Sequence, residues 1–174
     1  MKKDNILNDH TLIINELVRS IKFHNWNSIL SFLPKGSYLV GGYIRDIILK
    51  RVTEKVDIDI VVPFNAIEIG KMISENIKSK FIILDKEREV VRIILNHISI
   101  DIANQISSTI EGDLCSRDFS INSIAFLFDK KLLFDPLNGL KDLQFSLLKT
   151  YSEINLLNDP LRILRCFRFV SELN

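Results

Sequence analysis

Two aspartates, Asp57 and Asp59, are separated by one residue in a short apolar segment. Hydrophobic and polar residues alternate over residues 56–62, which predicts a β-strand whose successive side chains point to opposite faces. Both carboxylates then share one face, where they repel each other unless a cation lies between them. Mg²⁺ binds one or two carboxylates together with phosphate oxygens, so the pair is a candidate metal site. The same pattern is also typical of a polar strand face turned to solvent.

A third carboxylate, Asp101, lies on the polar face of another predicted strand, residues 98–103. Only Asn96 and His97 separate this strand from the β-rich residues 90–95, which predicts a hairpin. Three carboxylates from two strands can hold two metal ions for in-line phosphoryl displacement. Asp57, Asp59 and Asp101 are therefore the candidate catalytic residues, although Asp101 also fits a solvated position in a hairpin.

Gly41 and Gly42 separate a predicted strand, residues 37–40, from a predicted helix, residues 43–50. Glycine lets backbone N–H groups approach a phosphate, and the N-terminus of a helix favours an anion. Arg45 would lie on the first turn of that helix, within reach of the same phosphates. A tight turn that needs glycine for its conformation accounts for the pair as well.

Polar residues also mark the next predicted helix, residues 118–128. Arg117 and Asp118 stand at its start, and Asn122 lies among apolar residues, where a buried amide needs a polar partner. Asp118 is equally explained as a simple helix N-cap.

The last predicted helix begins at Asp159 and Pro160, with Asp as N-cap and Pro at the first position. Arg162, Arg165 and Arg168 share one arc of this helix. Together with Asp159 they could offer a base both donors and an acceptor. An amphipathic helix with a solvated basic face is the alternative.

The remaining pattern supplies the elements that must position these residues. Helices are predicted at residues 10–32 and 65–79, strands at 80–84 and 132–134, and turns at 135–136 and 138–139. The sum is an α+β fold, a mixed sheet with packed helices, followed by a helical segment.

Composition limits the class of protein. The chain has 174 residues, 47% of them hydrophobic and 26% charged, which suits one globular domain or one domain and the start of another. The net charge is only +1, so contact with RNA would depend on a local basic cluster. Cys115 and Cys166 are far apart and predict thiols of a reducing compartment. Without a signal-peptide core or an apolar stretch of membrane-spanning length, we expect a cytoplasmic protein with no membrane partner.

Five motifs, taken in order, resemble the class II tRNA nucleotidyltransferase (CCA-adding enzyme) and bacterial poly(A) polymerase family. They are YLVGGYIRD, DIDIVV, SRDFSINSIAF, DPLNGLKDL and DPLRILRCFRF, and the resemblance runs from about Ser37 to Phe169. The resemblance implies a polymerase-beta-type nucleotidyltransferase fold with Mg²⁺ bound by Asp57 and Asp59. ATP and CTP would be the substrates, the 3′ end of an RNA, most often tRNA, would attack, and pyrophosphate would leave. The implied nucleotide contacts are Gly41, Gly42, Arg45, Arg117, Asp159, Arg162, Arg165 and Arg168.

The resemblance also divides the chain. Residues 1–36 form an N-terminal helical segment, residues 37–150 the head domain, and residues 151–174 the start of a helical neck. Family members continue into further neck, body and tail domains, so we expect those domains or a separate protein partner to grip the RNA. A nucleotide-binding module without turnover of its own would fit the same features, because Phe167, Phe169 and Val170 are predicted to form an exposed apolar stripe.

Two details bear on specificity. The family's base-reading motif usually has Glu where this chain has Asn158, which removes a charge at the start of the last helix. Addition of CCA, CC, A or poly(A) is compatible with such a head, and the charged segment of residues 85–89 is a candidate specificity loop.

Overall fold

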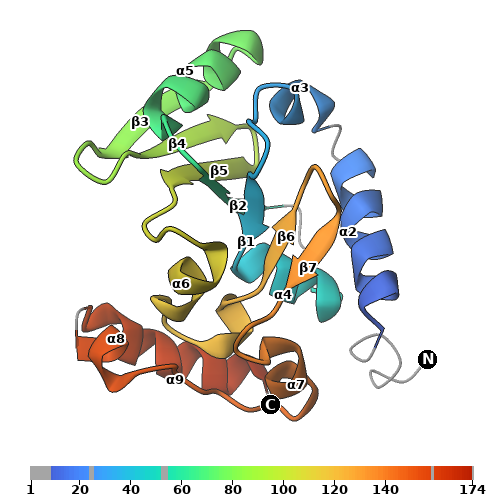
Figure 1. Ribbon diagram of the computed structural model, residues 1–174, viewed down its shortest axis with the longest axis vertical. Helices are drawn as coiled ribbons and strands as arrows, with labels where there is room; N and C mark the ends of the chain where they lie inside the picture. Colours follow the sequence, from blue (N-terminus) through green and yellow to red (C-terminus); the bar gives the residue numbers. More distant parts are fainter. Residues whose placement is uncertain (1–8, 24–25, 52–54, 158, 174) are drawn as a thin grey trace.

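A mixed β-sheet runs through the centre of the computed structural model, which describes residues 9–23, 26–51, 55–157 and 159–173 (Figure 1). Within these residues the sheet has seven strands in the order β3-β4-β5-β2-β1-β6-β7. β2 and β5 are parallel, and the other neighbouring pairs are antiparallel. The strands are β1 (Tyr38–Val40), β2 (Val56–Val62), β3 (Lys80–Asp85), β4 (Val90–Leu95), β5 (Ile98–Asn104), β6 (Ala125–Leu127) and β7 (Leu132–Phe134).

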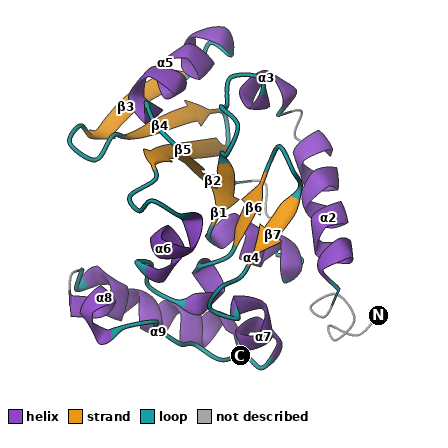
Figure 2. Ribbon diagram, viewed as in Figure 1, coloured by secondary structure: helices purple, strands orange, loops and turns teal. Residues whose placement is uncertain are grey.

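Helices cover the sheet unequally, as Figure 2 shows. α5 (Ala66–Asn76) packs on β3, β4 and β5, while α2 (His10–Phe23) lies beside α4 (Gly42–Ile48) and β7. The short α3 (Asn27–Leu30) contacts α5. α6 (Ile110–Cys115) packs on the opposite face of the sheet, in a separate apolar cluster. The 3₁₀ turn η1 (Ser120–Asn122), α7 (Gly139–Gln144) and α9 (Leu161–Leu173) contribute buried residues to the same core as α2, α4 and α5, and α8 (Glu153–Leu157) contacts α9. None of the described helices is long and apolar enough to cross a membrane.

The alternation of β2 divides its side chains between two environments. Val56, Ile58, Ile60 and Val62 are buried in the main core, together with residues of α2, α4 and α5. Val61 packs on the opposite face against α6, in a smaller apolar cluster that includes Ile110 and Leu114. α6 covers only part of that face, so the polar side of β2 opens toward α9. The predicted strand and its two faces are confirmed.

The predicted helix over residues 118–128 is wrong. The structure has the turn η1 followed by the strand β6, which lies between β1 and β7. All three residues of β6 are buried, so the segment is a continuous apolar run without alternation. Such a run cannot be distinguished from a buried helix by periodicity. Asp118 is therefore not a helix N-cap, and it instead accepts hydrogen bonds from Phe119 N and Asn122 Nδ2.

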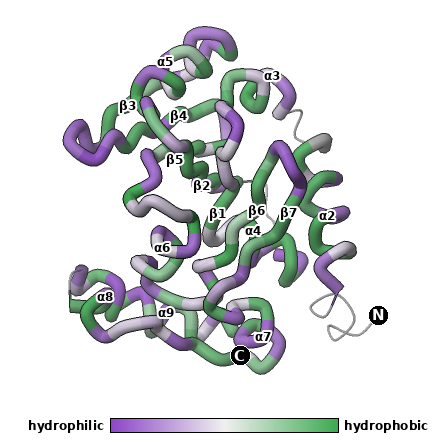
Figure 3. Tube along the Cα trace, in the orientation of Figure 1, coloured by the Kyte–Doolittle hydropathy of each residue, from purple (hydrophilic) through white to green (hydrophobic). Residues whose placement is uncertain are grey.

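Other boundaries also differ from the prediction. The N-terminal helix predicted over residues 10–32 is divided into α2 and α3, and Trp26 between them stacks on Tyr43 with ring centroids 5.6 Å apart. α6 was not predicted, nor was α7, which continues from the predicted turn at residues 138–139. The other strands, α5, and the last helix occupy the predicted segments. In Figure 3 the turn between β3 and β4 is hydrophilic, which matches the charged residues 85–89.

The apolar stripe predicted on the last helix is only partly correct. Phe167 is 72% exposed and Val170 is 49% exposed, but Phe169 is 1% exposed. Phe169 packs edge-to-face against Phe119, with ring centroids 5.6 Å apart, and this contact joins α9 to the residue that precedes η1. Phe169 is therefore a core residue.

Candidate active site

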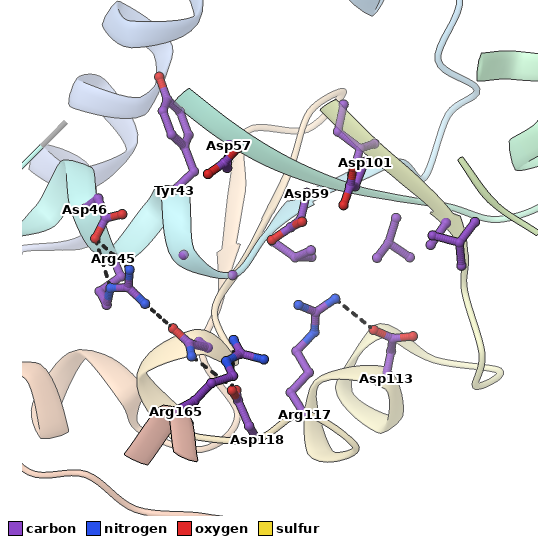
Figure 4. A pocket seen from close by; sticks show the side chains of 18 of the residues that line it. Tyr43, Arg45, Asp46, Asp57, Asp59, Asp101, Asp113, Arg117, Asp118 and Arg165 are labelled. Atoms are coloured by element: carbon purple, nitrogen blue, oxygen red, sulfur yellow. Dashed lines mark hydrogen bonds and ion pairs between the residues drawn. The ribbon is translucent and has the colours of Figure 1, made fainter. Parts of the chain in front are cut away.

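Three carboxylates lie side by side on β2 and β5. The parallel register of these strands pairs Asp57 with Ser99 and Asp59 with Asp101. In Figure 4 the side chains of Asp57, Asp59 and Asp101 face the same open space. Asp57 is exposed, whereas Asp59 and Asp101 are partly buried. The strand alternation and the sheet order thus bring together the three candidate catalytic residues.

Asp101 has a partner that the sequence analysis missed. Arg92 on β4 donates from Nε to Asp101 Oδ1 and from Nη2 to Asp101 Oδ2, both at 2.7 Å. Among the described residues, no three His, Cys, Asp or Glu side chains are arranged to hold one metal ion. The predicted hairpin would have identified this partner, because a two-residue turn at residues 96–97 pairs Arg92 with Asp101.

Burial and charge both act on Asp59. Desolvation raises the pKa of the Asp59 carboxyl above its ordinary value, and the neighbouring Asp101 and Asp57 raise it further. Arg117 and Arg165 oppose this rise in pKa. The negative charge is therefore poorly compensated by the chain itself, and a cation at this position would stabilise the ionised form.

Gly41 forms the turn between β1 and α4, directly beside Asp59. Its φ is +78°, in the region that favours glycine, and a Cβ at this position would lie 3.1 Å from Asp59 Oδ2. The N–H of Gly41 donates to the Ile124 carbonyl at 3.1 Å, so it is engaged within the fold. Gly42 is the first residue of α4 and lines, with Gly41 and Asp59, a cleft in the protein surface.

Replacing Gly41 by alanine is expected to reduce both stability and nucleotide binding. Gly36→Ala is a matched control, because Gly36 has a similar φ of +81° but no atom within 4 Å of an added Cβ. The positive φ should cost each variant about 1–3 kcal/mol of unfolding free energy. Only Gly41→Ala also displaces Asp59, so only it should weaken metal-dependent nucleotide binding in calorimetry. Equal binding by the two variants would contradict this role of Gly41.

A buried network connects α4 to α9. Arg45, which is 8% exposed, donates from Nε to Asp46 at 2.9 Å and from Nη1 to Asn122 Oδ1 at 2.6 Å. Asn122 Nδ2 donates to Asp118 at 3.1 Å, and Asp118 forms an ion pair with Arg165 at 3.0 Å. Figure 4 shows this chain of contacts at the base of the cleft. Asn122 thus has the partners that an amide in apolar surroundings requires.

The ring of Phe169 supports the same arginines. The guanidinium carbons of Arg45, Arg165 and Arg168 lie 4.9, 5.8 and 4.7 Å from its centroid. An arginine over an aromatic face is attracted by the ring quadrupole. Phe169 therefore gathers one cation from α4 and two from α9 on the cleft side of the helix.

The remaining residues predicted to contact the nucleotide are Arg117, Arg162 and Asp159, and each has partners within the protein. Arg117 points toward Asp59 and lies 3.5 Å from Asp113 (Figure 4). Arg162 donates to the carbonyls of Ser116 at 3.0 Å and Asn155 at 2.9 Å. Asp159 accepts from Leu161 N at 3.1 Å, as an N-terminal cap does. Asn158 lies outside the described residues.

One cleft of about 950 Å³ collects nearly all of these side chains. Asp159 is the predicted site residue that does not line it. The cleft also contains residues that the sequence did not single out as site residues, among them Asp46, Arg92 and Asp113. Its size suits a nucleotide-sized ligand.

Comparison with known proteins identifies the family. Residues 37–149 match the poly A polymerase head domain. The chain belongs to the poly A polymerase head domain family. The CC-adding tRNA nucleotidyltransferase of Synechocystis sp. is 42% identical over 144 residues, and this match covers 83% of the chain and 35% of that protein. The A-adding tRNA nucleotidyltransferase of Deinococcus radiodurans is 36% identical over 141 residues, which cover 81% of the chain and 31% of that protein.

A solved structure agrees with the fold of this head domain. An apo form of a CCA-adding enzyme superposes with a TM-score of 0.73 at 30% identity, and the match covers 89% of the chain and 40% of that structure. The polymerase-beta-type fold implied by the motifs is thereby confirmed. The chain spans about a third of the length of the two curated relatives named above.

Proposed function

We propose that this head domain transfers CMP, AMP or both from CTP and ATP to the 3′ end of a tRNA. The observation that carries the proposal is the position of Asp57 and Asp59 on one face of β2, in a cleft lined by Arg45, Arg117 and Arg165. Carboxylates alone would repel a nucleoside triphosphate, and arginines alone would bind it without activating it. The relatives that add CC or A support the reaction and the choice of acceptor.

The donor set at Asp57 and Asp59 fits Mg²⁺. The pair offers hard oxygen ligands, and burial, together with the neighbouring carboxylates, raises the pKa of Asp59, so a bound cation would favour its ionised form. Mg²⁺ is characteristically held by one or two carboxylates plus substrate phosphates. Bound there, the ion would supply activation of the attacking hydroxyl and compensation of the charge on the leaving group. Asp101 is hydrogen-bonded to Arg92, and it would add to the negative electrostatic potential beside this pair.

The remaining groups would bind and orient the two substrates. In the transfer step, the RNA 3′ oxygen forms a bond to the α-phosphorus, while the bond from that phosphorus to the pyrophosphate oxygen breaks. Arg45 and the turn at Gly41 and Gly42 lie on the β1 side of the carboxylates, where they would hold the triphosphate. Arg117 would neutralise charge close to Asp59.

α9 would read the base of the incoming nucleotide. Arg165 and Arg168 are oriented by Phe169 and Asp118 rather than being free surface cations. Planar guanidinium groups fixed in this way can present paired donors to a base edge. We assign Arg162 and Asp159 to the same function from their place in the motif, with Asp159 also capping the helix.

Exposed apolar side chains on α8 and α9 favour a second candidate function. Leu157, Leu161 and Phe167 are between 66% and 73% exposed. This surface would suit a nucleotide-binding module that needs further domains or a partner protein to hold RNA. Poly(A) addition is a further alternative, because the same head could serve it.

The proposal includes the organisation of the chain. Residues 37–150 would form the head domain, residues 1–36 a supporting helical segment, and residues 151–174 the start of a helical neck. The acceptor RNA and the two free thiols, Cys115 and Cys166, are consistent with a cytoplasmic location.

Extension of tRNA tests the function directly. Transcripts lacking A, CA or CCA are incubated with CTP or ATP and Mg²⁺, with the double variant Asp57→Ala Asp59→Ala as control. We expect extension by the wild type on at least one transcript and none by the double variant. Extension that survives in the double variant would contradict the metal assignment. Nucleotide binding with metal-dependent heat but no extension would favour the binding module.

A further inference from the structure

Arg92 has unused hydrogen-bonding capacity in the cleft. It contacts Asp101 side-on, through Nε and Nη2, which leaves the Nη1 amino group without an acceptor in the described part of the chain. The Arg92 side chain is 41% exposed, so Nη1 is not buried against the protein. An arginine held by two bonds of 2.7 Å is a fixed donor rather than a mobile surface cation.

The sheet order places Arg92 opposite the groups assigned to the triphosphate. Reading across β4, β5, β2 and β1, the sequence of groups is Arg92, Asp101, Asp59 and then the Gly41 turn. Neighbouring strands are about 4.8 Å apart, so Arg92 lies roughly 10 Å from β2 on the side away from β1. The triphosphate and Arg92 therefore flank the aspartate pair from opposite sides.

The geometry of in-line displacement predicts which substrate approaches Arg92. The attacking 3′ oxygen must approach the α-phosphorus from the side opposite the leaving pyrophosphate. If the pyrophosphate leaves toward β1 and α4, the acceptor RNA arrives from the side of β4 and β5. The last phosphodiester of that RNA would then come close to the three carboxylates, which repel it.

We propose that Arg92, oriented by Asp101, binds a backbone phosphate near the 3′ end of the acceptor RNA. This inference rests on the proposed function of the head. Asp101 keeps the guanidinium plane fixed, and Nη1 donates to a phosphate oxygen. The charge of Arg92 also offsets the repulsion between the RNA and the carboxylates. Asp101 is thereby a positioning residue for RNA, in addition to its place beside the metal-binding pair.

Separate measurements of RNA and nucleotide binding test the assignment. RNA affinity is measured by fluorescence anisotropy with a 5′-labelled acceptor-stem hairpin lacking CCA, and CTP and ATP affinity by calorimetry with Mg²⁺. We expect Arg92→Ala to weaken RNA binding about tenfold, as loss of one charged hydrogen-bonded contact should. The slope of log affinity against log salt concentration should fall by about 0.7 to 0.9, which corresponds to one phosphate contact. Nucleotide affinity should change less than twofold.

Arg19→Ala is the matched control. Arg19 is on α2, away from the cleft, where its side chain is 82% exposed and 4.0 Å from Glu16. This substitution also removes one positive charge, so a purely electrostatic loss of RNA affinity should be equal in the control variant and in Arg92→Ala. Arg92→Lys keeps the charge but loses the fork that Asp101 holds, and we expect RNA affinity between those of the wild type and Arg92→Ala. This variant also covers the case in which Arg92→Ala does not fold.

The outcomes separate this inference from the proposed function. Equal RNA binding by Arg92→Ala and Arg19→Ala, or a parallel loss of nucleotide affinity, would overturn the role of Arg92. Wild-type protein that binds nucleotide but no RNA would overturn it too, while leaving the nucleotide half of the proposed function intact. Absence of metal-dependent nucleotide binding by the wild type would instead contradict the proposed function itself.

Discussion

Replacing Asp59 by asparagine is expected to abolish nucleotidyl transfer and, at the same time, to stabilise the fold at neutral pH. Loss of a carboxylate that we propose holds the metal should remove several kcal/mol of transition-state stabilisation, so the rate should fall by at least about 10³-fold. The stabilising effect arises because burial raises the pKa of Asp59 in the folded protein. Ionised Asp59 therefore costs folding free energy that neutral asparagine does not.

The pH dependence gives the sign of this effect. Below the unfolded pKa of about 3.9, Asp59 is protonated in both the folded and the unfolded protein, and its burial costs no charge. As the pH rises through the raised folded pKa, the folded protein must ionise a buried carboxyl, and its stability relative to the unfolded chain falls. Without metal, the melting temperature of Asp59→Asn should thus exceed that of the wild type at pH 7, and the difference should shrink toward pH 4. Scanning calorimetry across this range measures it.

Asp57→Asn is the matched control for Asp59→Asn. The two residues share a strand face, but Asp57 is exposed and Asp59 is partly buried. Both variants should lose activity, whereas only Asp59→Asn should gain stability without metal. Added Mg²⁺ with nucleotide should raise the melting temperature of the wild type more than that of either variant. A lower melting temperature for Asp59→Asn than for the wild type at pH 7 would contradict this prediction. It would show that the attraction between ionised Asp59 and Arg117 stabilises the fold by more than burial of the charge costs.

The parts of the site that could be predicted depend on local geometry. A strand period of two decides that Asp57 and Asp59 share a face, and no distant contact can change that. A two-residue hairpin turn fixes the pairing of β4 with β5, which places Arg92 opposite Asp101. The parallel pairing of β5 with β2 is different, because it joins segments about forty residues apart through α5. Alternation predicts that Asp101 lies on a polar strand face, but neither it nor the five motifs, which leave out residues 98–104, identifies the neighbouring strand.

The parts that could not be predicted depend on long-range packing. Phe169 has the pattern of an exposed helical residue, but its packing on Phe119 and beneath Arg45 buries it in the main core. The segment of β6 has the composition of a buried helix, and it becomes a strand because β1 and β7 offer it hydrogen bonds on both edges. The sequence indicates that Asn122 needs a partner but does not identify Arg45, which is 77 residues away.

Asn122→Ala is expected to have the second large effect, on stability and on nucleotide binding together. The substitution removes the acceptor for Arg45 Nη1 and the donor to Asp118, both in buried surroundings. A buried charge deprived of its partner costs about 3–5 kcal/mol, less here because Asp46 and Phe169 still contact Arg45, so we expect a loss of about 3 kcal/mol. For a domain of this size that corresponds to roughly 6–12 °C in melting temperature.

The functional consequence of this substitution follows from the position of Asn122 between Arg45 and Arg165, which we propose bind the nucleotide. Arg45 of α4 and Arg165 of α9 are connected only through Asn122 and Asp118 among the hydrogen bonds and ion pairs of the described residues. Even at temperatures where Asn122→Ala is folded, CTP and ATP should bind at least about tenfold more weakly, as loss of one charged contact predicts. Asn76→Ala, at an exposed position on α5, should change neither property. A folded Asn122→Ala protein with unchanged nucleotide affinity would show that the network stabilises the head without aligning its arginines.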